Sequence, residues 1–140
     1  MKKETNSCYT YFRIAGNFDP DRISEMLGLR PDKQWKIGDL RRNGTAYDCA
    51  LWTHGTCTSY DVITNNQLLI TLEDFFPRIH TLQEIKREYD VSFFLTIVPT
   101  ISTEESTPVL SPSLDVMRFC CETETEIDLD LYVYSSDDSK

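Results

Sequence analysis

The C-terminal part of the chain carries its most regular pattern of polar and apolar positions. From Glu126 to Tyr134 the two kinds of residue alternate almost without error, which is typical of a β-strand with one side against a core and the other side exposed. The side expected to cover the core consists of Ile127, Leu129, Leu131 and Val133. The side expected to face water or a partner consists of Glu126, Asp128, Asp130, Tyr132 and Tyr134.

Local signals near the N-terminus predict a strand over residues 8–16 followed by a short helix. Asp19 can cap this helix, Pro20 suits its first position, and Gly28 is a typical residue just past its end. Between these signals the apolar residues have helical spacing. The helix is therefore predicted from both of its ends and from its interior.

The dipeptide Asn43-Gly44 predicts a β-hairpin, because both residues accept the positive φ angles of a two-residue turn. In the register that follows, Trp35 lies opposite Trp52. The same register places Asp39 opposite Asp48, which is unfavourable for two ionised carboxylates. Either a bulge shifts the pairing there, or the carboxylates turn toward water and nearby basic side chains.

Apolar positions keep helical spacing from about residue 66 to residue 89, and Pro77 interrupts them. We expect two helices here, or one kinked helix, packed on the sheet. The apolar run at residues 91–98 predicts a largely buried central strand. Residues 54–64 are polar and predict an irregular segment, and residues 100–108 predict a mobile loop.

A last helix is predicted after Ser111-Pro112, which repeats the capping signal of Asp19-Pro20. The elements then follow the order β-α-β-β-α-β-α-β. This order predicts an α+β fold, a mainly antiparallel sheet with helices on one face, and its first six elements match a ferredoxin-like split βαβ core. A length of 140 residues predicts one domain, 1–140, with flexible ends at about 1–7 and 135–140.

The net charge of -9 is distributed unevenly along the chain. Residues 1–60 hold nine basic and seven acidic side chains, whereas residues 61–140 hold five basic and sixteen acidic ones. An acidic protein gains nothing from neutralising phosphates, so a nucleic-acid partner is not expected. A basic protein would be attracted toward the C-terminal half.

Sequence features that indicate a compartment point to the cytoplasm. No apolar run follows Met1-Lys2-Lys3, and the longest apolar run, Phe93–Pro99, is too short to cross a bilayer. The five cysteines are odd in number and have no repeated spacing, which argues against a disulfide framework and favours a reducing compartment.

The acidic side of the last strand is the first candidate site. Its partner-binding residues are Glu126, Asp128, Asp130 and Tyr132. Their carboxylates lie roughly 6–7 Å apart along a strand, which suits a row of Lys and Arg side chains on another protein better than one metal ion. The alternative interpretation is a solvated edge strand that its charges protect from aggregation.

The predicted hairpin is the second candidate site. Trp35 and Trp52, with Asp39 and Asp48, form a possible ligand platform among several basic side chains. The alternative interpretation is a tryptophan pair in the core, because large aromatic side chains dominate cores.

The sequence predicts no catalytic residue, metal or cofactor. Cys49, His54 and Cys57 have no obvious fourth zinc ligand. Glycine-rich phosphate loops, the nucleophile elbow and the zinc-helix motif are all missing. A binding role is therefore favoured over an enzyme.

Several segments resemble a bacterial family known as domain of unknown function 4279. In the first half these are Tyr11–Gly16, Phe18–Leu29 and Trp35–Asp39, and in the second half Leu110–Leu114 and Ile127–Val133. The family pattern has a glycine-containing turn before its last strand, where this chain has residues 121–124 without glycine. The resemblance implies a single-domain bacterial cytosolic protein and supplies no activity.

These observations together favour a protein-binding module. One version is an immunity-type protein that neutralises a basic toxin through the acidic strand. The alternative is a small-ligand-binding protein or enzyme that uses the Trp35/Trp52 hairpin. The oligomeric state and the identity of any partner stay open.

Overall fold

The computed structural model describes residues 6–60, 65–103 and 111–135. In chain order the elements are β1 (Ser7–Asn17), α1 (Pro20–Leu27), β2 (Lys33–Trp35), β3 (Ala50–Ser59), α2 (Asn65–Leu72), η1 (Phe76–Arg78), α3 (Ile79–Glu88), β4 (Asp90–Ser102), α4 (Leu114–Thr123), β5 (Thr125–Leu129) and β6 (Tyr132–Tyr134).

The flexible ends predicted from the sequence lie largely outside the described residues. Asn6 and Ser7, which the predicted N-terminal end includes, are among the described residues, and Ser7 begins β1. Asn6 is buried, and its side-chain oxygen accepts the backbone N–H of Ser102 at 2.7 Å. The first strand is thereby fastened to the end of β4.

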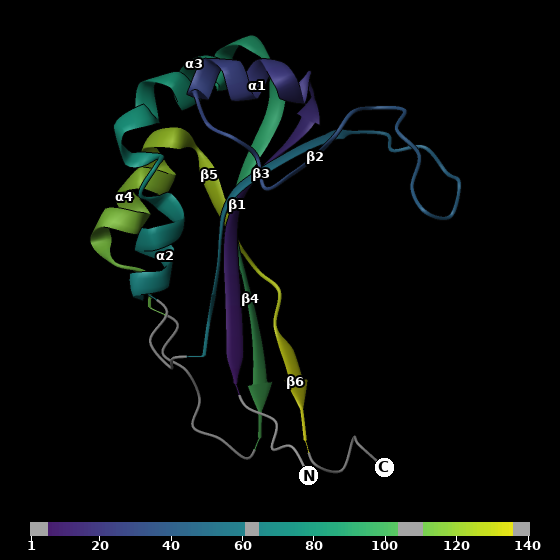
Figure 1. Ribbon diagram of the computed structural model, residues 1–140. Helices are drawn as coiled ribbons and strands as arrows, with labels where there is room; N and C mark the ends of the chain where they lie inside the picture. Colours follow the sequence, from purple (N-terminus) through teal and green to yellow (C-terminus); the bar gives the residue numbers. More distant parts are fainter. Residues whose placement is uncertain (1–5, 61–64, 104–110, 136–140) are drawn as a thin grey trace.

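The strands form one sheet in the order β2-β3-β1-β4-β5, and β6 also pairs with β4 (Figure 1). β1 and β2 are both antiparallel to β3, so they run parallel to each other with β3 between them. β4 lies antiparallel on the other side of β1. This is the ferredoxin-like split βαβ arrangement that the element order predicted, and β5 and β6 extend it as strands parallel to β4.

The four α-helices cover one face of the sheet and leave the other face open (Figure 1). The core between the two layers is aromatic, and its largest fully buried side chains are Trp52, Phe12, Phe75, Phe93 and Phe119. The ring centroids of Phe12 and Phe75 lie 4.4 Å apart. The predicted α+β class and the placement of helices on one face are confirmed.

The helix signals of the sequence are mostly confirmed. Asp19 caps α1 through a bond from the N–H of Asp21 at 3.0 Å, and Gly28 ends the helix in the left-handed conformation. Pro77 separates α2 from α3 and lies in the short 3-10 helix between them. The predicted cap of the last helix is wrong, because Ser113 caps α4 in place of Ser111.

Two segments predicted to be irregular are strands instead. β3 continues to Ser59 because it pairs with the long central strand β1. β4 continues to Ser102 because it pairs with β1 as far as Thr100 and with β6 as far as Ser102. Pairing with neighbouring strands therefore determines where β3 and β4 end, even though their polar residues have a low strand preference. The remaining parts of the two predicted segments, residues 61–64 and 104–110, lie outside the described residues.

The alternating strand at the C-terminus is divided into β5 and β6. Both parts pair with β4 in one continuous register, with Leu129 beside Ile97 and Tyr132 beside Thr100. The division lies opposite Pro99, which has no N–H to donate to the ladder.

The apolar side of this strand does not cover the core as predicted. Ile127, Leu129, Leu131 and Val133 are exposed by 42%, 51%, 47% and 58%. These four side chains lie on the side of the sheet that the helices cover, but β5 and β6 form the edge of the sheet. The buried core lies under the central strands, and among the described side chains of β5 and β6 only that of Thr125, at the start of β5, is buried.

The hairpin register differs from the prediction by one residue. Trp35 pairs with Leu51, and Gln34 pairs with Trp52. The turn is longer than two residues, since Arg41 N–H bonds to Thr45 O at 2.8 Å around the Asn43-Gly44 pair. A one-residue shift moves each side chain to the opposite face, so the two tryptophans lie on opposite sides of the sheet.

Candidate binding site on the open face of the sheet

The open face of the sheet has small side chains at its centre and large ones around them. The strand pairing sets Lys33, Thr53, Arg13 and Phe94 in one row across β2, β3, β1 and β4. Thr53 lies in this row between two long cationic side chains and is buried. A short residue flanked by long ones leaves a depression above it.

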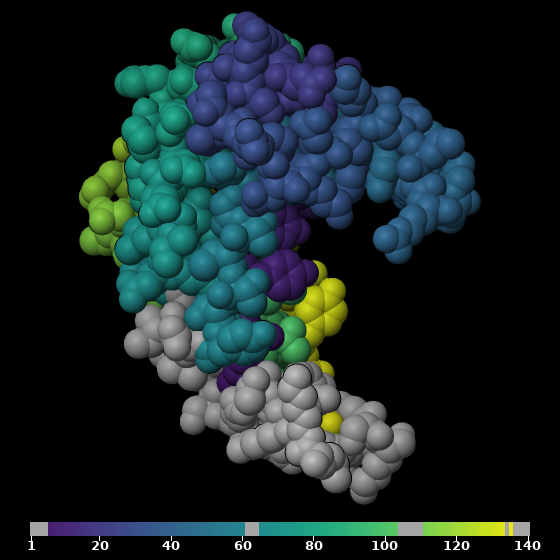
Figure 2. All heavy atoms as spheres, in the orientation of Figure 1, coloured from purple at the N-terminus to yellow at the C-terminus, as the bar shows by residue number. Residues whose placement is uncertain are grey.

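This depression is a hollow of about 590 Å³. Its lining residues are Tyr9, Tyr11, Arg13, Ala15, Asp32, Lys33, Trp35, Cys49, Leu51, Thr53 and Thr56. Figure 2 shows the molecule hollowed beneath the projecting blue segment around residues 36–49, where purple atoms of β1 and yellow atoms of the C-terminal strand reach the surface. We call this site the hollow.

One wall of the hollow is formed by Lys33 and Trp35, which belong to an aromatic and cationic stack that continues outside the hollow at the base of the projecting segment. The rings of Trp35 and Tyr47 stack with centroids 3.9 Å apart and planes inclined by 13°. Trp35 Nε1 donates to the carbonyl of Cys49 at 3.0 Å, which fixes the indole. The Lys33 ammonium lies 5.4 Å from the Trp35 ring, and the Arg41 guanidinium lies 4.7 Å from the Tyr47 ring.

Trp52, the other half of the predicted platform, does not belong to this wall. It is fully buried on the helix side of the sheet, and its Nε1 donates to Ser24 Oγ at 2.9 Å. The predicted Trp35/Trp52 pair is therefore wrong as a single site. Tyr47 takes the place beside Trp35 that the sequence register gave to Trp52.

The opposite wall is formed by tyrosines of β1. Tyr9 and Tyr11 stack with centroids 6.1 Å apart. Tyr132 of β6 lies near them and donates its hydroxyl to Asp130 at 3.2 Å. This hydrogen bond and the charge of Asp130 raise the pKa of the Tyr132 phenol.

Arg13 crosses the open face beside the hollow. Its Nη2 donates to Asp128 Oδ2 at 3.4 Å, and its guanidinium lies 4.3 Å from the centre of the Phe94 ring. The Nε atom is buried and has no hydrogen-bond partner among the described residues. The guanidinium therefore lies toward β4 and β5, on the side of β1 away from Thr53, and its ion pair engages a single nitrogen.

The four predicted partner-binding residues lie on the C-terminal edge of the sheet. Asp128 is tied to Arg13, and Asp130 accepts the Tyr132 hydroxyl. Glu126 is exposed. The acidic side therefore borders the open face, and two of its carboxylates already have partners within the chain.

The predicted carboxylate pair of the hairpin is not formed. Asp39 turns its side chain back onto its own segment and accepts the N–H of Lys36 at 2.8 Å. Across the hairpin, its carbonyl accepts the N–H of Tyr47, not that of Asp48. Both aspartates are exposed and lie outside the lining of the hollow.

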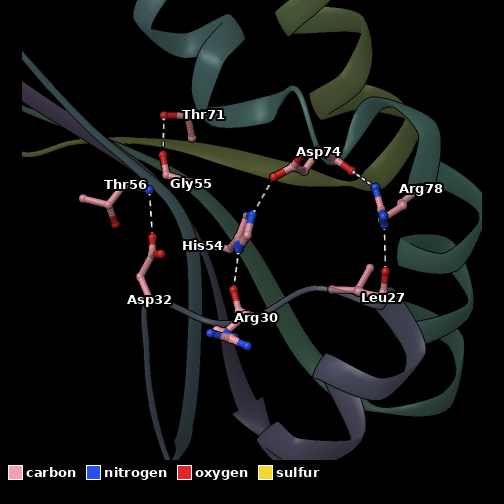
Figure 3. A network of polar contacts seen from close by, with 9 residues as sticks. All are labelled: Leu27, Arg30, Asp32, His54, Gly55, Thr56, Thr71, Asp74 and Arg78. Atoms are coloured by element: carbon pink, nitrogen blue, oxygen red, sulfur yellow. Dashed lines mark hydrogen bonds and ion pairs between the residues drawn. The ribbon is translucent and has the colours of Figure 1, made fainter.

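A polar network behind the hollow fixes the strands that form it (Figure 3). His54 Nδ1 lies 2.6 Å from the carbonyl of Arg30, and its Nε2 lies 2.9 Å from Asp74 Oδ2. Asp32 accepts the N–H of Thr56 at 2.8 Å. These contacts hold the segment before β2 against β3, so that Lys33 and Trp35 stand at a fixed position.

A β-bulge in β3 gives the network its shape. Two residues, Gly55 and Thr56, lie opposite the single residue Tyr11 of β1. Thr71 of α2 donates its hydroxyl to the Gly55 carbonyl at 2.8 Å, as Figure 3 shows. The bulge turns Thr56 to the open face, where it lines the hollow.

The described part of the chain contains no group of three or more metal-ligating side chains. Cys49 lines the hollow, whereas His54 is held between a carbonyl and a carboxylate. Similarly, no helix among the described residues is long and apolar enough to cross a membrane.

Sequence reasoning missed Tyr9, Tyr11, Arg13 and Tyr47. A signal was present for the first three, because they stand at alternate positions of a predicted strand whose other side is apolar. The same alternation that drew attention to the last strand would have placed them together on one face.

The fold and the hollow define an open-faced α+β domain with a single helix layer and a hollow lined by aromatic side chains on its uncovered side. The chain belongs to the family described as Domain of unknown function (DUF4279), whose model matches residues 6–134. The resemblance seen in the sequence is thus confirmed over nearly the whole chain. No curated protein and no solved structure gave a significant match.

Proposed function

We propose that the protein is a binding module that holds a small, ring-bearing ligand in the hollow. The observation that carries this proposal is the hollow itself, about 590 Å³ on the helix-free face of the sheet. Pockets for small ligands typically measure about 300–1,000 Å³ and are lined by apolar and aromatic side chains with a few polar groups. The Trp35, Tyr9 and Tyr11 rings and the Arg13 and Lys33 cations provide such a lining.

The floor of the hollow supports a preformed site. Thr53 and Leu51 belong to β3, which is paired on both sides, and both residues are buried. The Trp35 indole is fixed by its hydrogen bond and by its stack on Tyr47. Rings that are already ordered lose little side-chain entropy when a ligand ring stacks on them.

A screen of ring-bearing fragments by ligand-observed NMR tests the proposal. We expect fragments that bind the wild type and lose binding in Trp35→Ala and in Tyr11→Ala. Tyr60→Ala is the matched control, since Tyr60 is 71% exposed and lies outside the hollow. A screen without binders, or binders that the two hollow variants retain, would contradict the proposal.

A second candidate function is recognition of a basic protein at the C-terminal edge of the sheet. The observation that favours it is the exposure of this edge on both sides. Glu126 and Asp130 are exposed on one side, and a row of apolar side chains is exposed on the other. An exposed acidic edge with apolar neighbours suits a cationic partner that also buries apolar area, and an immunity-type protein that neutralises a basic toxin is one such case.

Affinity capture from a bacterial lysate distinguishes this second candidate. Glu126→Gln/Asp130→Asn removes the two exposed charges and keeps Asp128, which is paired with Arg13. Glu84→Gln/Glu88→Gln on α3 changes the net charge equally and serves as the control. A basic protein captured in near-stoichiometric amount by wild type and control, but lost by the edge variant, is expected. Equal capture by all three proteins would refute this candidate.

We also propose that the protein works in a bacterial cytoplasm. All five cysteines are free thiols in the structure, which suits a reducing compartment. Fractionation of the native host, with a periplasmic marker as control, tests this placement.

A further inference from the structure

Two cations flank the floor of the hollow. Arg13 and Lys33 both pair with Thr53, from opposite sides of β3. Strands of a sheet are spaced about 4.8 Å apart, so the two backbones lie roughly 10 Å from each other. Both side chains line the hollow, and the small Thr53 side chain between them leaves the space above it unfilled.

Arg13 has donors that the fold does not use. Its one ion pair, to Asp128, is long at 3.4 Å and engages a single nitrogen. Its buried Nε has no partner among the described residues. A guanidinium carries five N–H donors in a planar fork that matches an oxyanion. In the free protein it lies toward β4 and β5, over Phe94 and beside Asp128. An anion above Thr53 is therefore bound when the side chain turns from this long ion pair toward β3.

Lys33 is the less committed of the two cations. Within residues 6–60, 65–103 and 111–135 no carboxylate lies within ion-pair distance of its ammonium. The carboxylate that lines the hollow, Asp32, already accepts the N–H of Thr56. The lining therefore holds two cations, of which Arg13 is paired with Asp128, against one carboxylate, although the chain as a whole has a net charge of -9.

The rings that could stack on a ligand lie beside these cations. Trp35 is two residues from Lys33 on the same face of β2, and Tyr11 is two residues from Arg13 on the same face of β1. Side chains two residues apart on a strand are roughly 6–7 Å from each other. A ring and a negative charge that occupy these positions together can belong to one small molecule.

From these contacts we infer that the ligand of the hollow is a planar organic oxyanion, a ring compound that carries a carboxylate or phosphate. The anion lies between Arg13 and Lys33 above Thr53, and the ring contacts Trp35 and Tyr11. This inference rests on the proposed function, because it names the class of ligand for the same site.

Two fluorescent probes with the same ring system test the inference. 8-Anilino-1-naphthalenesulfonate carries an oxyanion, and N-phenyl-1-naphthylamine lacks it. We would titrate both probes into the wild type, Arg13→Gln, Lys33→Gln and the control Arg118→Gln. Arg118 lines a separate groove between the helices, so this control reports binding of the probe there. Circular dichroism spectra and melting temperatures establish that each variant is folded.

The sulfonate is expected to bind the wild type more tightly than the neutral probe. Each loss of Arg13 or Lys33 should weaken its binding by about tenfold, since a hydrogen bond to a charged group contributes about that factor. The neutral probe and the Arg118 control should be unaffected. Lys33 is exposed, so Lys33→Gln keeps the test valid if Arg13→Gln fails to fold.

Other outcomes distinguish a failure of this inference from a failure of the proposed function. If both probes bind equally well and neither hollow variant weakens the sulfonate, the inference is overturned while a ring-binding hollow stands. If the Arg118 variant alone loses the sulfonate, the probe occupies the helix groove, and the inference is also overturned. If neither probe binds the wild type, both the inference and the proposed function fail.

Discussion

The bulge at Gly55 provides the most direct test of how the helix layer positions the open face. Gly55 has a φ of +80°, and a Cβ built on it would lie 2.4 Å from the carbonyl oxygen of Thr71. Gly55→Ala therefore imposes two separate costs. One is the left-handed conformation, and the other is the clash with the backbone of α2.

The size of the effect follows from these two costs. The left-handed conformation costs an L-residue about 1–2 kcal/mol. Relief of the clash requires α2 to move away from β3, which breaks the Thr71–Gly55 hydrogen bond and loosens core packing for about 2 kcal/mol more. We expect Gly55→Ala to lower the free energy of unfolding by about 3–4 kcal/mol in total. Domains of this size typically have about 5–15 kcal/mol.

Urea unfolding followed by tryptophan fluorescence measures this loss. Gly28→Ala is the matched control, since Gly28 has a φ of +66° but no atom within 4 Å of its built Cβ. The control should lose only the conformational cost, about 1 kcal/mol. Equal losses in the two variants would refute the reasoning, because they would show that the contact with α2 costs nothing.

Three further predictions concern single side chains. Glu124 ends α4 with a φ of +53°, so Glu124→Gly should raise the free energy of unfolding by about 1 kcal/mol. Glu122→Gly, inside the helix, should lower it by a similar amount. Urea unfolding that ranks the stabilities of the two variants in the other order would contradict this. Acrylamide should quench the emission of Trp35 but not that of buried Trp52. Trp35→Phe should therefore leave a blue-shifted, protected spectrum, and a quenchable remainder would argue against the burial of Trp52 on the helix side of β3. Burial raises the pKa of the Cys120 thiol from 9.0 to about 11, so the folded state holds this proton more tightly than the unfolded state. The stability that the neutral thiol contributes should be complete below about pH 9 and lost as the pH rises through about 11. In urea unfolding the wild type should lose more stability over this range than Cys120→Ala, and equal losses would disprove the shift.

The placement of the helices could be predicted from the sequence because their signals are local. Asp19, Pro20 and Gly28 act on their own backbone, and their effects on α1 need no distant partner. The order of strands and helices follows from similar signals. That order restricts the sheet to a few topologies, of which the ferredoxin-like one is formed.

The candidate site could be predicted only in part, because it depends on register. The pair Asn43-Gly44 correctly marks a turn, but the longer turn around it shifts the pairing by one residue. That shift sends Trp52 into the core and leaves Trp35 on the open face. The stack with Tyr47 then depends on a contact across the hairpin that no local preference determines.

The sequence by itself determined the fold class, both ends of α1 and the alternation of the last strand, since each depends on backbone preferences and on spacing along the chain. Only the tertiary structure decided which alternating side is buried. Ile127 and Leu129 face the helix side and are nevertheless exposed, because their strand lies at the edge of the sheet, beyond the buried core. The hollow has the same origin. Its floor and walls come from β1, β2 and β3, and residues separated by up to 47 positions, from Tyr9 to Thr56, meet there only because the sheet brings their strands together.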